Sequence, residues 1–343
     1  MGDVRYNLQF GKLCAVLRLG ELLGRPLPLP GGFSHRMYAI ETEQGKYAVK
    51  ALNPQVMQRP EVVRNFIRSE QIAGIAARKI PALPARIFKD TVIPEVDVQF
   101  YLVFDWTDGK SLKPNEITAV HCEKIGAILA GLHRTDFSEA GLPVDEVHPM
   151  QPTDWGSFLQ KGRKNHSVWA DALDEVMDRL SRWESRAYQA SIRLASARVI
   201  SHRDLDPKNV LWEGDSPLVI DWEAAGYVHP VQELVETAVY WSENEAGAID
   251  KERFLAFTAG YRRKYGAFQI NWKAVLEAGF SARLEWLEYN LKRSLRMDCT
   301  DREEQQVGNA QAAASISTLA RYSEMIPVLE KWLDEMWGIR QDG

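Results

Sequence analysis

One stretch near the middle of the chain, residues 199–223, constrains the fold more than any other part. It reads V-I-S-H-R-D-L-D-P-K-N-V-L-W-E-G-D-S-P-L-V-I-D-W-E. Two apolar runs, 210–212 and 218–220, flank a polar turn, a pattern typical of two short antiparallel strands. Such a hairpin places Asn209, at its start, and Asp221, at its end, at one edge.

The polar residues of this stretch indicate a particular chemistry. The amide oxygen of Asn209 and the carboxylate of Asp221 are hard ligands of the kind that Mg²⁺ takes together with phosphate oxygens. Asp204 lies one loop earlier, where it can accept a proton from an attacking hydroxyl. Lys208 is either a contact for the γ-phosphate or a surface lysine. Since several spacings agree at once, the stretch predicts phosphoryl transfer from ATP rather than a chance turn.

The first third of the chain supplies residues that suit a nucleotide. Lys50 ends the alternating strand K-Y-A-V-K, where its ammonium can reach phosphate oxygens. Glu70, on the following helix, is its predicted ion-pair partner, because Glu61 falls in the first helical turn and complements the helix dipole. The turn at residues 31–34, G-G-F-S, lets backbone N–H groups approach phosphate, with the Ser34 hydroxyl as a further donor. An ordinary structural turn is the alternative.

A further nucleotide contact is expected at residues 101–109, Y-L-V-F-D-W-T-D-G, where an apolar strand turns polar abruptly. The backbone groups of Asp105 and Thr107 could pair there with the edge of an adenine. An ordinary interdomain linker is the alternative reading of the same residues.

Apolar periodicity predicts an α+β fold in two lobes, residues 1–104 and 105–343. The first lobe is expected to be mostly antiparallel sheet with one main helix. Its predicted elements are a helix over 8–24, strands over 36–42 and 46–52, a helix of about four turns from Pro60, and extended segments over 85–89 and 98–104. The second lobe is expected to be mostly helical, over 114–134, 154–196 with a break, 231–264, 272–296 and 302–338, with its strands confined to 198–222.

Composition excludes several classes of protein. The 343 residues carry a net charge of −5 without a concentrated basic stripe, which gives nucleic-acid binding little support. No segment approaches 18 uncharged apolar residues, so a membrane span is not expected. The first ten residues lack the order of a signal peptide. Three cysteines, Cys14, Cys122 and Cys299, have no metal spacing and fit a reducing cytoplasm, where we expect the protein.

Together these motifs resemble the aminoglycoside phosphotransferase and choline kinase-like family, small-molecule relatives of the protein kinases. The resemblance runs from about Pro30 to Trp241. Its most specific parts are I-S-H-R-D-L-D-P-K-N-V-L-W and V-I-D-W-E, with G-G-F-S-H-R-M-Y-A-I, Y-A-V-K and L-A-G-L-H as weaker members. It implies a bilobal protein-kinase-like fold with a small antiparallel N-lobe and a larger helical C-lobe that carries a short catalytic hairpin.

The resemblance also implies a role for each matching residue. Asp204 corresponds to the catalytic base, and Asn209 and Asp221 to the magnesium ligands. The nucleotide contacts it implies are Lys50 for the α- and β-phosphates, Glu70 as the helix glutamate, Ser34 as the nucleotide-loop serine, and the backbone of Asp105 and Thr107 at the hinge.

Three departures from related patterns limit the assignment. Many family members have glycine where Arg203 stands, which makes the phrase look closer to the protein kinases. Yet Asp221-Trp222-Glu223 replaces D-F-G and no A-P-E follows, so a protein kinase would lack its activation segment. Glu233 stands where the family often has an Asp-Leu-Ala-like phrase, and it is expected to brace the loop.

The predicted function is transfer of the γ-phosphoryl group of Mg-ATP, with GTP possible, to a hydroxyl of a small molecule. Carboxylates beside tryptophans favour a cationic amino alcohol or an aminoglycoside-like acceptor, while sugars and macrolides stay open. The acceptor candidates are Asp206, Glu223, Tyr240, Trp241, Glu243 and Glu245, with Asp154 and Trp155. Most of the 11 tryptophans are expected to fill a helical core. The alternative function is a catalytically silent, nucleotide-binding regulatory module, and the sequence leaves the oligomeric state open.

Overall fold

The computed structural model describes residues 6–30, 35–143, 151–194, 197–268, 270–297 and 302–338. The chain forms two compact units. Unit 1 comprises Met1–Val144, Val199–Val228 and Tyr240–Tyr265, and unit 2 comprises Asp145–Arg198, His229–Val239 and Gly266–Gly343. The lobe boundary that the sequence predicts between residues 104 and 105 lies inside unit 1 and stays a prediction.

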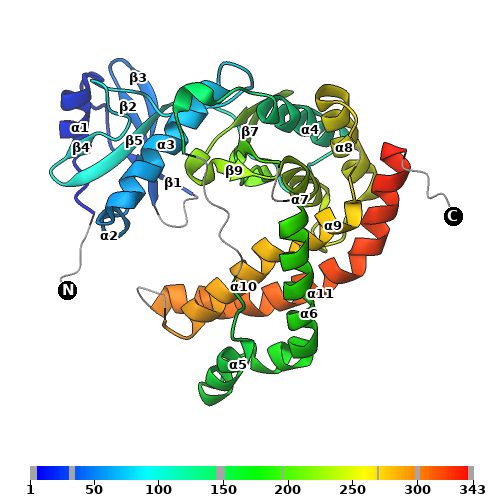
Figure 1. Ribbon diagram of the computed structural model, residues 1–343. Coiled ribbons are helices and arrows are strands. Elements are labelled where there is room, and N and C mark those ends of the chain that lie inside the picture. Colours follow the sequence, from blue (N-terminus) through cyan, green and yellow to red (C-terminus); the bar gives the residue numbers. More distant parts are fainter. Residues whose placement is uncertain are drawn as a thin grey trace. The chain divides into compact units, whose positions relative to one another are not determined.

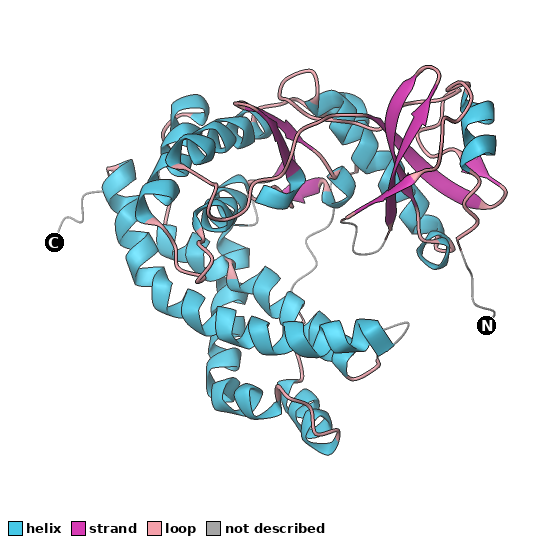
Figure 2. Ribbon diagram, turned by 180° about the vertical axis from the view of Figure 1, so that it is seen from behind, coloured by secondary structure: helices cyan, strands magenta, loops and turns pink. Residues whose placement is uncertain are grey.

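Unit 1 begins with a five-stranded antiparallel sheet in the order β1-β2-β3-β5-β4 (Figures 1 and 2). Its strands are β1 (Leu27–Leu29), β2 (Arg36–Thr42), β3 (Gly45–Ala51), β4 (Glu95–Val96) and β5 (Gln99–Asp105). The predicted hairpin of residues 36–52 is confirmed as β2 and β3. Residues 85–89 do not form a strand. Phe88 forms an isolated bridge with Thr91, and the N–H of Arg86 donates to the carbonyl of Val103 (2.7 Å).

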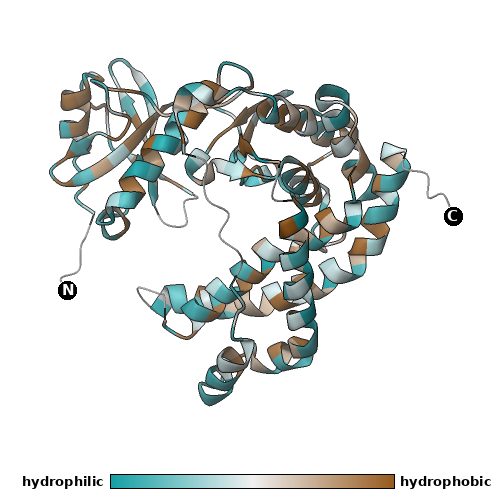
Figure 3. Cartoon of the chain, viewed as in Figure 1, coloured by the Kyte–Doolittle hydropathy of each residue, from teal (hydrophilic) through white to brown (hydrophobic). Residues whose placement is uncertain are grey.

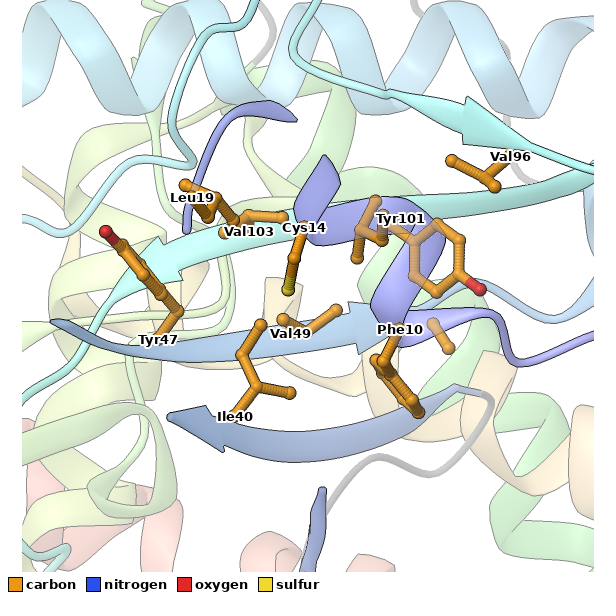
Figure 4. Close-up of a cluster of buried hydrophobic side chains, with 11 residues drawn as sticks. Phe10, Cys14, Leu19, Ile40, Tyr47, Val49, Val96, Tyr101 and Val103 are labelled. Atoms are coloured by element: carbon orange, nitrogen blue, oxygen red, sulfur yellow. The ribbon is translucent and has the colours of Figure 1, made fainter. Parts of the chain in front are cut away.

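The two faces of this sheet bury different side chains because successive residues of a strand point to opposite sides. One face packs against α1 (Phe10–Leu17), and Figure 4 shows Phe10 and Cys14 of this helix beside Ile40, Val49 and Tyr101. The opposite face joins strand residues such as Leu102 to side chains of α2 (Pro54–Met57) and α3 (Pro60–Ala76). Lys50 alternates with Val49 and therefore belongs to the α3 face.

Besides α1, α2 and α3, unit 1 contains the helices α4 (Ala119–His133) and α8 (Lys251–Tyr265) and the short 3-10 helix η1 (Ser138–Ala140). Helix α4 begins later than the predicted residue 114 because Thr118 and His121 form a reciprocal cap. The Thr118 side chain accepts from the His121 N–H, and the His121 ring accepts from the Thr118 N–H. The predicted helix over 8–24 likewise ends early, at Leu17, where Arg18 turns to a φ of 57°.

Two small antiparallel sheets of two strands each complete the strands of unit 1. Strand β6 (Val199–Ser201) pairs with β9 (Gly226–Val228), which lies beyond the predicted limit of residue 222. Strand β7 (Val210–Glu213) pairs with β8 (Ser216–Val219), which confirms the predicted hairpin. The 3-10 turns η2 (Pro207–Asn209) and η3 (Trp222–Ala224) lie at the open end of this hairpin.

Unit 2 is helical in its described part. Its helices are α5 (Trp155–Lys164), α6 (Ala170–Leu194), most of α7 (Pro230–Ser242), α9 (Trp272–Ala278), α10 (Phe280–Ser294) and α11 (Arg302–Trp337). Figure 3 shows hydrophobic and hydrophilic residues interleaved along α6 and α11, as expected for helices with one buried face. The predicted break in 154–196 is confirmed, while 231–264 and 272–296 are also interrupted.

Tryptophans fill the core of unit 2, as expected from the sequence. Trp183 stacks on Phe280 at 5.5 Å between ring centroids, and Trp272 packs 5.4 Å from Trp337. Trp155 is also buried, so it does not offer its ring to an acceptor. None of the described helices is long and apolar enough to span a membrane.

Two glycines allow α4 and α8 to cross at close range in unit 1. A Cβ atom at Gly126 would collide with the carbonyl of Phe257, and one at Gly260 would collide with the carbonyl of Glu123. We therefore expect Gly126→Ala to destabilise the protein by about 1–3 kcal/mol or more through overpacking. Urea unfolding followed by circular dichroism measures the change.

Gly74 in α3 is the matched control, because a Cβ atom there meets nothing within 4 Å. Gly74→Ala should leave stability unchanged or raise it by up to about 1 kcal/mol, since alanine favours the helix. Equal destabilisation by the two variants would contradict the close crossing of α4 and α8.

Candidate active site

The loop after β6 is held by the buried side chain of His202. The Nδ1 atom accepts from the Asp204 N–H (3.2 Å), so the proton resides on Nε2, which donates to the carbonyl of Ile220 (2.9 Å). The ring also packs edge-on against Trp222, at 4.7 Å between centroids. His202 thus ties the loop that carries Asp204 to the end of the β7–β8 hairpin.

Asp204 and Asn209, which the sequence predicts to act together, are in contact. The Nδ2 atom of Asn209 donates to the backbone carbonyl of Asp204 (2.8 Å) and to its Oδ2 atom (2.8 Å). Because both donors of the amide are used in this way, its Oδ1 atom faces the other direction as an acceptor. Burial raises the pKa of Asp204, and the nearby ammonium of Lys208 opposes the shift.

Lys208 is paired with two carboxylates of the same loop. Its Nζ atom lies 2.7 Å from Oδ2 of Asp206 and 3.4 Å from both carboxylate oxygens of Asp204. The other oxygen of Asp206 accepts from the backbone N–H of Lys208 (2.8 Å). Asp206, a predicted acceptor contact, therefore has both oxygens engaged within the loop.

The β7–β8 hairpin brings Asn209 and Asp221 to one edge, as predicted. The N–H of Ile220 donates to the carbonyl of Asn209 (3.0 Å), which places the metal-ligand candidates on either side of the last hairpin hydrogen bond. Asp221 adopts a left-handed φ of 61° and Arg203 one of 65°. The position of Arg203 thus has the conformation that glycine adopts without strain, which accounts for the glycine common at this point in the related family.

The ammonium of Lys50 lies between two carboxylates at the hairpin end. Its Nζ atom is 2.8 Å from Oδ1 of Asp221 and 3.1 Å from Oε2 of Glu223. The Lys50 side chain is only 8% exposed. Burial by itself lowers the pKa of Lys50, but the two carboxylates outweigh it and the net shift is upward.

The ion pair predicted between Lys50 and Glu70 is replaced by this arrangement. The buried carboxylate of Glu70 accepts from the N–H of Ala85 (2.7 Å), and the ammonium of Lys50 is bonded to the hairpin carboxylates. Burial raises the pKa of Glu70 to about 7 despite the opposing hydrogen bond from Ala85. The prediction was wrong because the sequence cannot show that Asp221 and Glu223 reach Lys50 from residues more than 170 positions away.

His35 is a member of this cluster that sequence analysis missed. It is buried, and its Nδ1 atom accepts from the N–H of Asn53 (2.9 Å). Its Nε2 atom lies 3.8 Å from Oε2 of Glu223. Burial lowers the pKa of His35, against the attraction of Glu223, so the neutral ring is favoured. A histidine directly after G-G-F-S was the only signal in the sequence.

The donor set at the hairpin edge fits Mg²⁺. Asn209 presents a carboxamide oxygen whose amide nitrogen is fixed by Asp204, and Asp221 presents a carboxylate. Mg²⁺ is commonly bound through one or two such protein oxygens together with water and phosphate. Within the described ranges, no group of three or more His, Cys, Asp and Glu side chains is arranged to hold a metal.

The backbone groups at the predicted hinge point away from the neighbouring strand. In the antiparallel pair β3–β5, residue pairs that share backbone hydrogen bonds alternate with pairs that do not. Leu52 and Phe100 are a bonded pair, since the N–H of Leu52 donates to the carbonyl of Phe100 (2.9 Å). Counting along the register from there, Tyr47 and Asp105 are a pair without such bonds. The N–H and C=O of Asp105 therefore point away from β3. The Thr107 hydroxyl accepts from the N–H of Gly109 (3.3 Å) and closes the following turn.

The remaining predicted residues differ in position. Trp241 is fully buried and its indole N–H donates to the carbonyl of Leu205 (2.9 Å), so it supports the loop that carries Asp204 and has no surface left for an acceptor. Glu245 is exposed beyond the end of α7 and stays a predicted acceptor contact. Asp154 caps α5 through the N–H of Ser157. Ser34 lies outside the described residues.

Similar proteins agree with this fold. A homoserine kinase from Methylobacillus glycogenes is 25% identical over 245 residues, 71% of either chain. The structure of a spectinomycin phosphotransferase, solved with ADP and spectinomycin, covers 92% of this chain and 99% of its own, with a TM-score of 0.67 and 11% identity. The structure of a choline kinase from Cryptosporidium parvum covers 91% of this chain and 92% of its own, with a TM-score of 0.58 and 13% identity.

These solved structures share a kinase-like fold with this chain. The match to the phosphotransferase enzyme family extends over residues 26–267, and the chain belongs to this family. The predicted α+β, protein-kinase-like fold is confirmed.

The raised pKa of Glu70 gives stability a distinct pH dependence. The folded chain keeps this proton up to about pH 7, whereas the unfolded chain releases it near the ordinary value of 4.5. The contribution of Glu70 to stability therefore falls as the pH rises from about 4.5 to 7, by at most about 3 kcal/mol.

Glu70→Gln removes this titration and keeps an oxygen for the N–H of Ala85. The stability of the variant minus that of the wild type should be larger at pH 8 than at pH 5. Urea unfolding of both proteins at both pH values measures this difference. Comparison at each pH cancels the contributions of other groups. An identical pH dependence in the two proteins would show that Glu70 has an ordinary pKa.

Proposed function

We propose that this protein transfers the γ-phosphoryl group of a nucleoside triphosphate to a hydroxyl of a small molecule. The observation that carries the proposal is the contact between Asp204 and Asn209 at the open end of a hairpin, where Asp221 also lies and pairs with Lys50. Family membership and nucleotide-bound structures of similar fold support it. ATP is the proposed donor, with GTP as a possible substitute.

Asp204 is the proposed catalytic base. Its carboxylate orients the acceptor hydroxyl and takes its proton while the hydroxyl oxygen bonds to the γ-phosphorus. The bond from that phosphorus to the β–γ bridging oxygen breaks, and the electron pair leaves with the nucleoside diphosphate. Because the transition state of such a transfer is loose, most of the catalysis is positioning and charge stabilisation.

The other residues hold the donor. Lys50 is proposed to contact the α- and β-phosphates, while the backbone of Asp105 and Thr107 contacts the base. Asn209 and Asp221 would hold Mg²⁺, which when bound neutralises charge on the triphosphate. Lys208, 3.4 Å from the Asp204 carboxylate, lies where a cation can face the transferred group.

The proposed acceptor is a small molecule with a hydroxyl and a cationic nitrogen. Similar proteins are named for homoserine, spectinomycin and choline, and each of these compounds combines the two groups. On this chain, Glu245 is an exposed carboxylate available to pair with such a nitrogen, and Glu223 is 41% exposed. A soluble, cytoplasmic location without nucleic-acid or membrane partners is proposed with this function.

The catalytic role is tested by Asp204→Asn, with release of nucleoside diphosphate from Mg-ATP followed over amino alcohols, aminoglycosides, homoserine, sugars and macrolides. The substitution should lower turnover by about 10²–10⁴-fold, because it removes the general base. Nucleotide affinity should change little. Asp215→Asn is the control, since that carboxylate is 90% exposed in the hairpin turn. Turnover that survives in Asp204→Asn would remove Asp204 from the base role.

The absence of any acceptor above the Asp204→Asn background would favour a silent nucleotide-binding module over an enzyme. Addition of GTP in place of ATP to the same assay tests the donor preference.

The metal role is tested by Asp221→Ala. This variant should lose the gain in nucleotide affinity that Mg²⁺ gives to the wild-type protein, because one of two ligand side chains is missing. Titration calorimetry with ADP, in Mg²⁺ and in EDTA, measures that gain. A full magnesium effect in the variant would contradict the ligand assignment.

A further inference from the structure

Apart from the acceptor contact predicted for it, Glu223 has no role in the phosphotransfer mechanism proposed above. Its Oε2 atom is 3.1 Å from Nζ of Lys50 and 3.8 Å from Nε2 of His35. The side chains of Lys50 and His35 are only 8% and 5% exposed, whereas Glu223 is 41% exposed. A single carboxylate thus lies near two buried nitrogen groups, one from β3 and one from the residue that precedes β2.

Lys50 requires a partner that stays in place when nucleotide binds. Its ammonium has three N–H donors, of which Asp221 and Glu223 take one each in this structure. Under the proposed function, Asp221 is committed to the metal. Glu223 is then the carboxylate that continues to hold the ammonium, with the remaining donors directed to phosphate.

Glu70 is poorly suited to the same duty. Its carboxylate is buried and already accepts from the N–H of Ala85 at 2.7 Å. This hydrogen bond ties the carboxylate to the segment after α3.

The buried ring of His35 is fixed in one tautomer. Because Nδ1 accepts from the N–H of Asn53 (2.9 Å), the ring proton is carried by Nε2, the atom nearest Glu223. The distance of 3.8 Å from Nε2 to the Glu223 carboxylate is too long for a hydrogen bond. The Nε2–H group therefore acts on the carboxylate through its dipole. The ring packs edge-on against Phe66, at 5.4 Å between centroids.

We infer that Glu223, oriented by His35, is the positioning residue for the phosphate-binding Lys50, in the place predicted for Glu70. This inference rests on the proposed function and extends it. The arrangement anchors Lys50 to the hairpin that carries Asp221, so one short segment would position both the metal ligand and the phosphate-binding cation.

The test is the affinity for ADP, measured by titration calorimetry in Mg²⁺ and again in EDTA. Glu223→Gln should weaken binding in Mg²⁺ by about tenfold, the scale of one charge-assisted hydrogen bond, and less in EDTA, where Asp221 is free to hold Lys50. Glu70→Gln should weaken it less. In a Lys50→Met background the Glu223→Gln substitution should have less than about a twofold further effect, because the two residues act as a unit.

His35 is tested with two substitutions that each keep one half of the ring's function. His35→Asn retains an oxygen for the Asn53 N–H but lacks the group that faces Glu223, and it should weaken ADP binding by about threefold. His35→Gln can keep a donor near Glu223 and should bind ADP more tightly than His35→Asn. Combined with Glu223→Gln, the His35→Asn substitution should add no further loss.

Several results would overturn the inference. A larger loss in Glu70→Gln than in Glu223→Gln would return the anchor to α3. A loss in Mg²⁺ that persists in full in the Lys50→Met background would show that Glu223 acts on the metal or the nucleotide and not through Lys50. Wild-type affinity of Glu223→Gln in Mg²⁺ would remove Glu223 from the nucleotide site. Glu213→Gln, an exposed carboxylate at the end of β7, controls for the change in net charge.

Failure of the proposed function gives a different result from failure of this inference. A wild-type protein that binds no nucleotide would end the proposed function itself. Circular dichroism and a melting curve for each variant identify any loss of fold. If Glu223→Gln does not fold, the comparison of His35→Asn with His35→Gln still tests the contact: equal affinities in these two variants would contradict it.

Discussion

The buried ammonium of Lys50 is the group on which the arrangement of the site depends. A lysine with 8% of its side chain exposed is costly unless carboxylates surround it, and Asp221 and Glu223 supply that compensation at 2.8 and 3.1 Å. These contacts connect β3 of the five-stranded sheet to the end of the β7–β8 hairpin. The electrostatic requirement of one cation thereby fixes the place where phosphate and metal groups would meet.

The hairpin organises the opposite side of the site through its hydrogen bonds. Asn209 uses its amide nitrogen on Asp204 and its backbone carbonyl on Ile220, so one residue links the catalytic loop to the strand that leads to Asp221. His202 and Trp241 support the same loop with a ring nitrogen and an indole nitrogen. The hydrogen bonds of these supporting side chains hold the loop and the hairpin together.

Much of the site could be predicted because its chemistry is local in the sequence. The spacing of Asp204, Asn209 and Asp221 follows from a loop, a tight hairpin and its register, all within residues 199–223, and the observed pairing of Val210 with Val219 agrees with it. The β2–β3 hairpin and the start of α3 at Pro60 were likewise predictable from alternation and a helix-start proline. Errors gathered at element ends, such as α4, where a reciprocal cap rather than periodicity sets the first residue.

The sequence by itself determined the class of chemistry and an α+β fold, because both depend on short-range patterns of charge and apolar spacing. The kinase-like arrangement of that fold came from the resemblance of its motifs to a known family. Only the tertiary structure decided which carboxylate holds Lys50, that His35 joins the cluster, and that Trp241 is a support rather than an acceptor contact. Each of these depends on residues far apart in the chain, whose side chains meet only after the sheet and the hairpin have folded. Which carboxylate pairs with the buried Lys50 ammonium depends on distances and solvation in the folded protein, and residue spacing along the chain does not determine these.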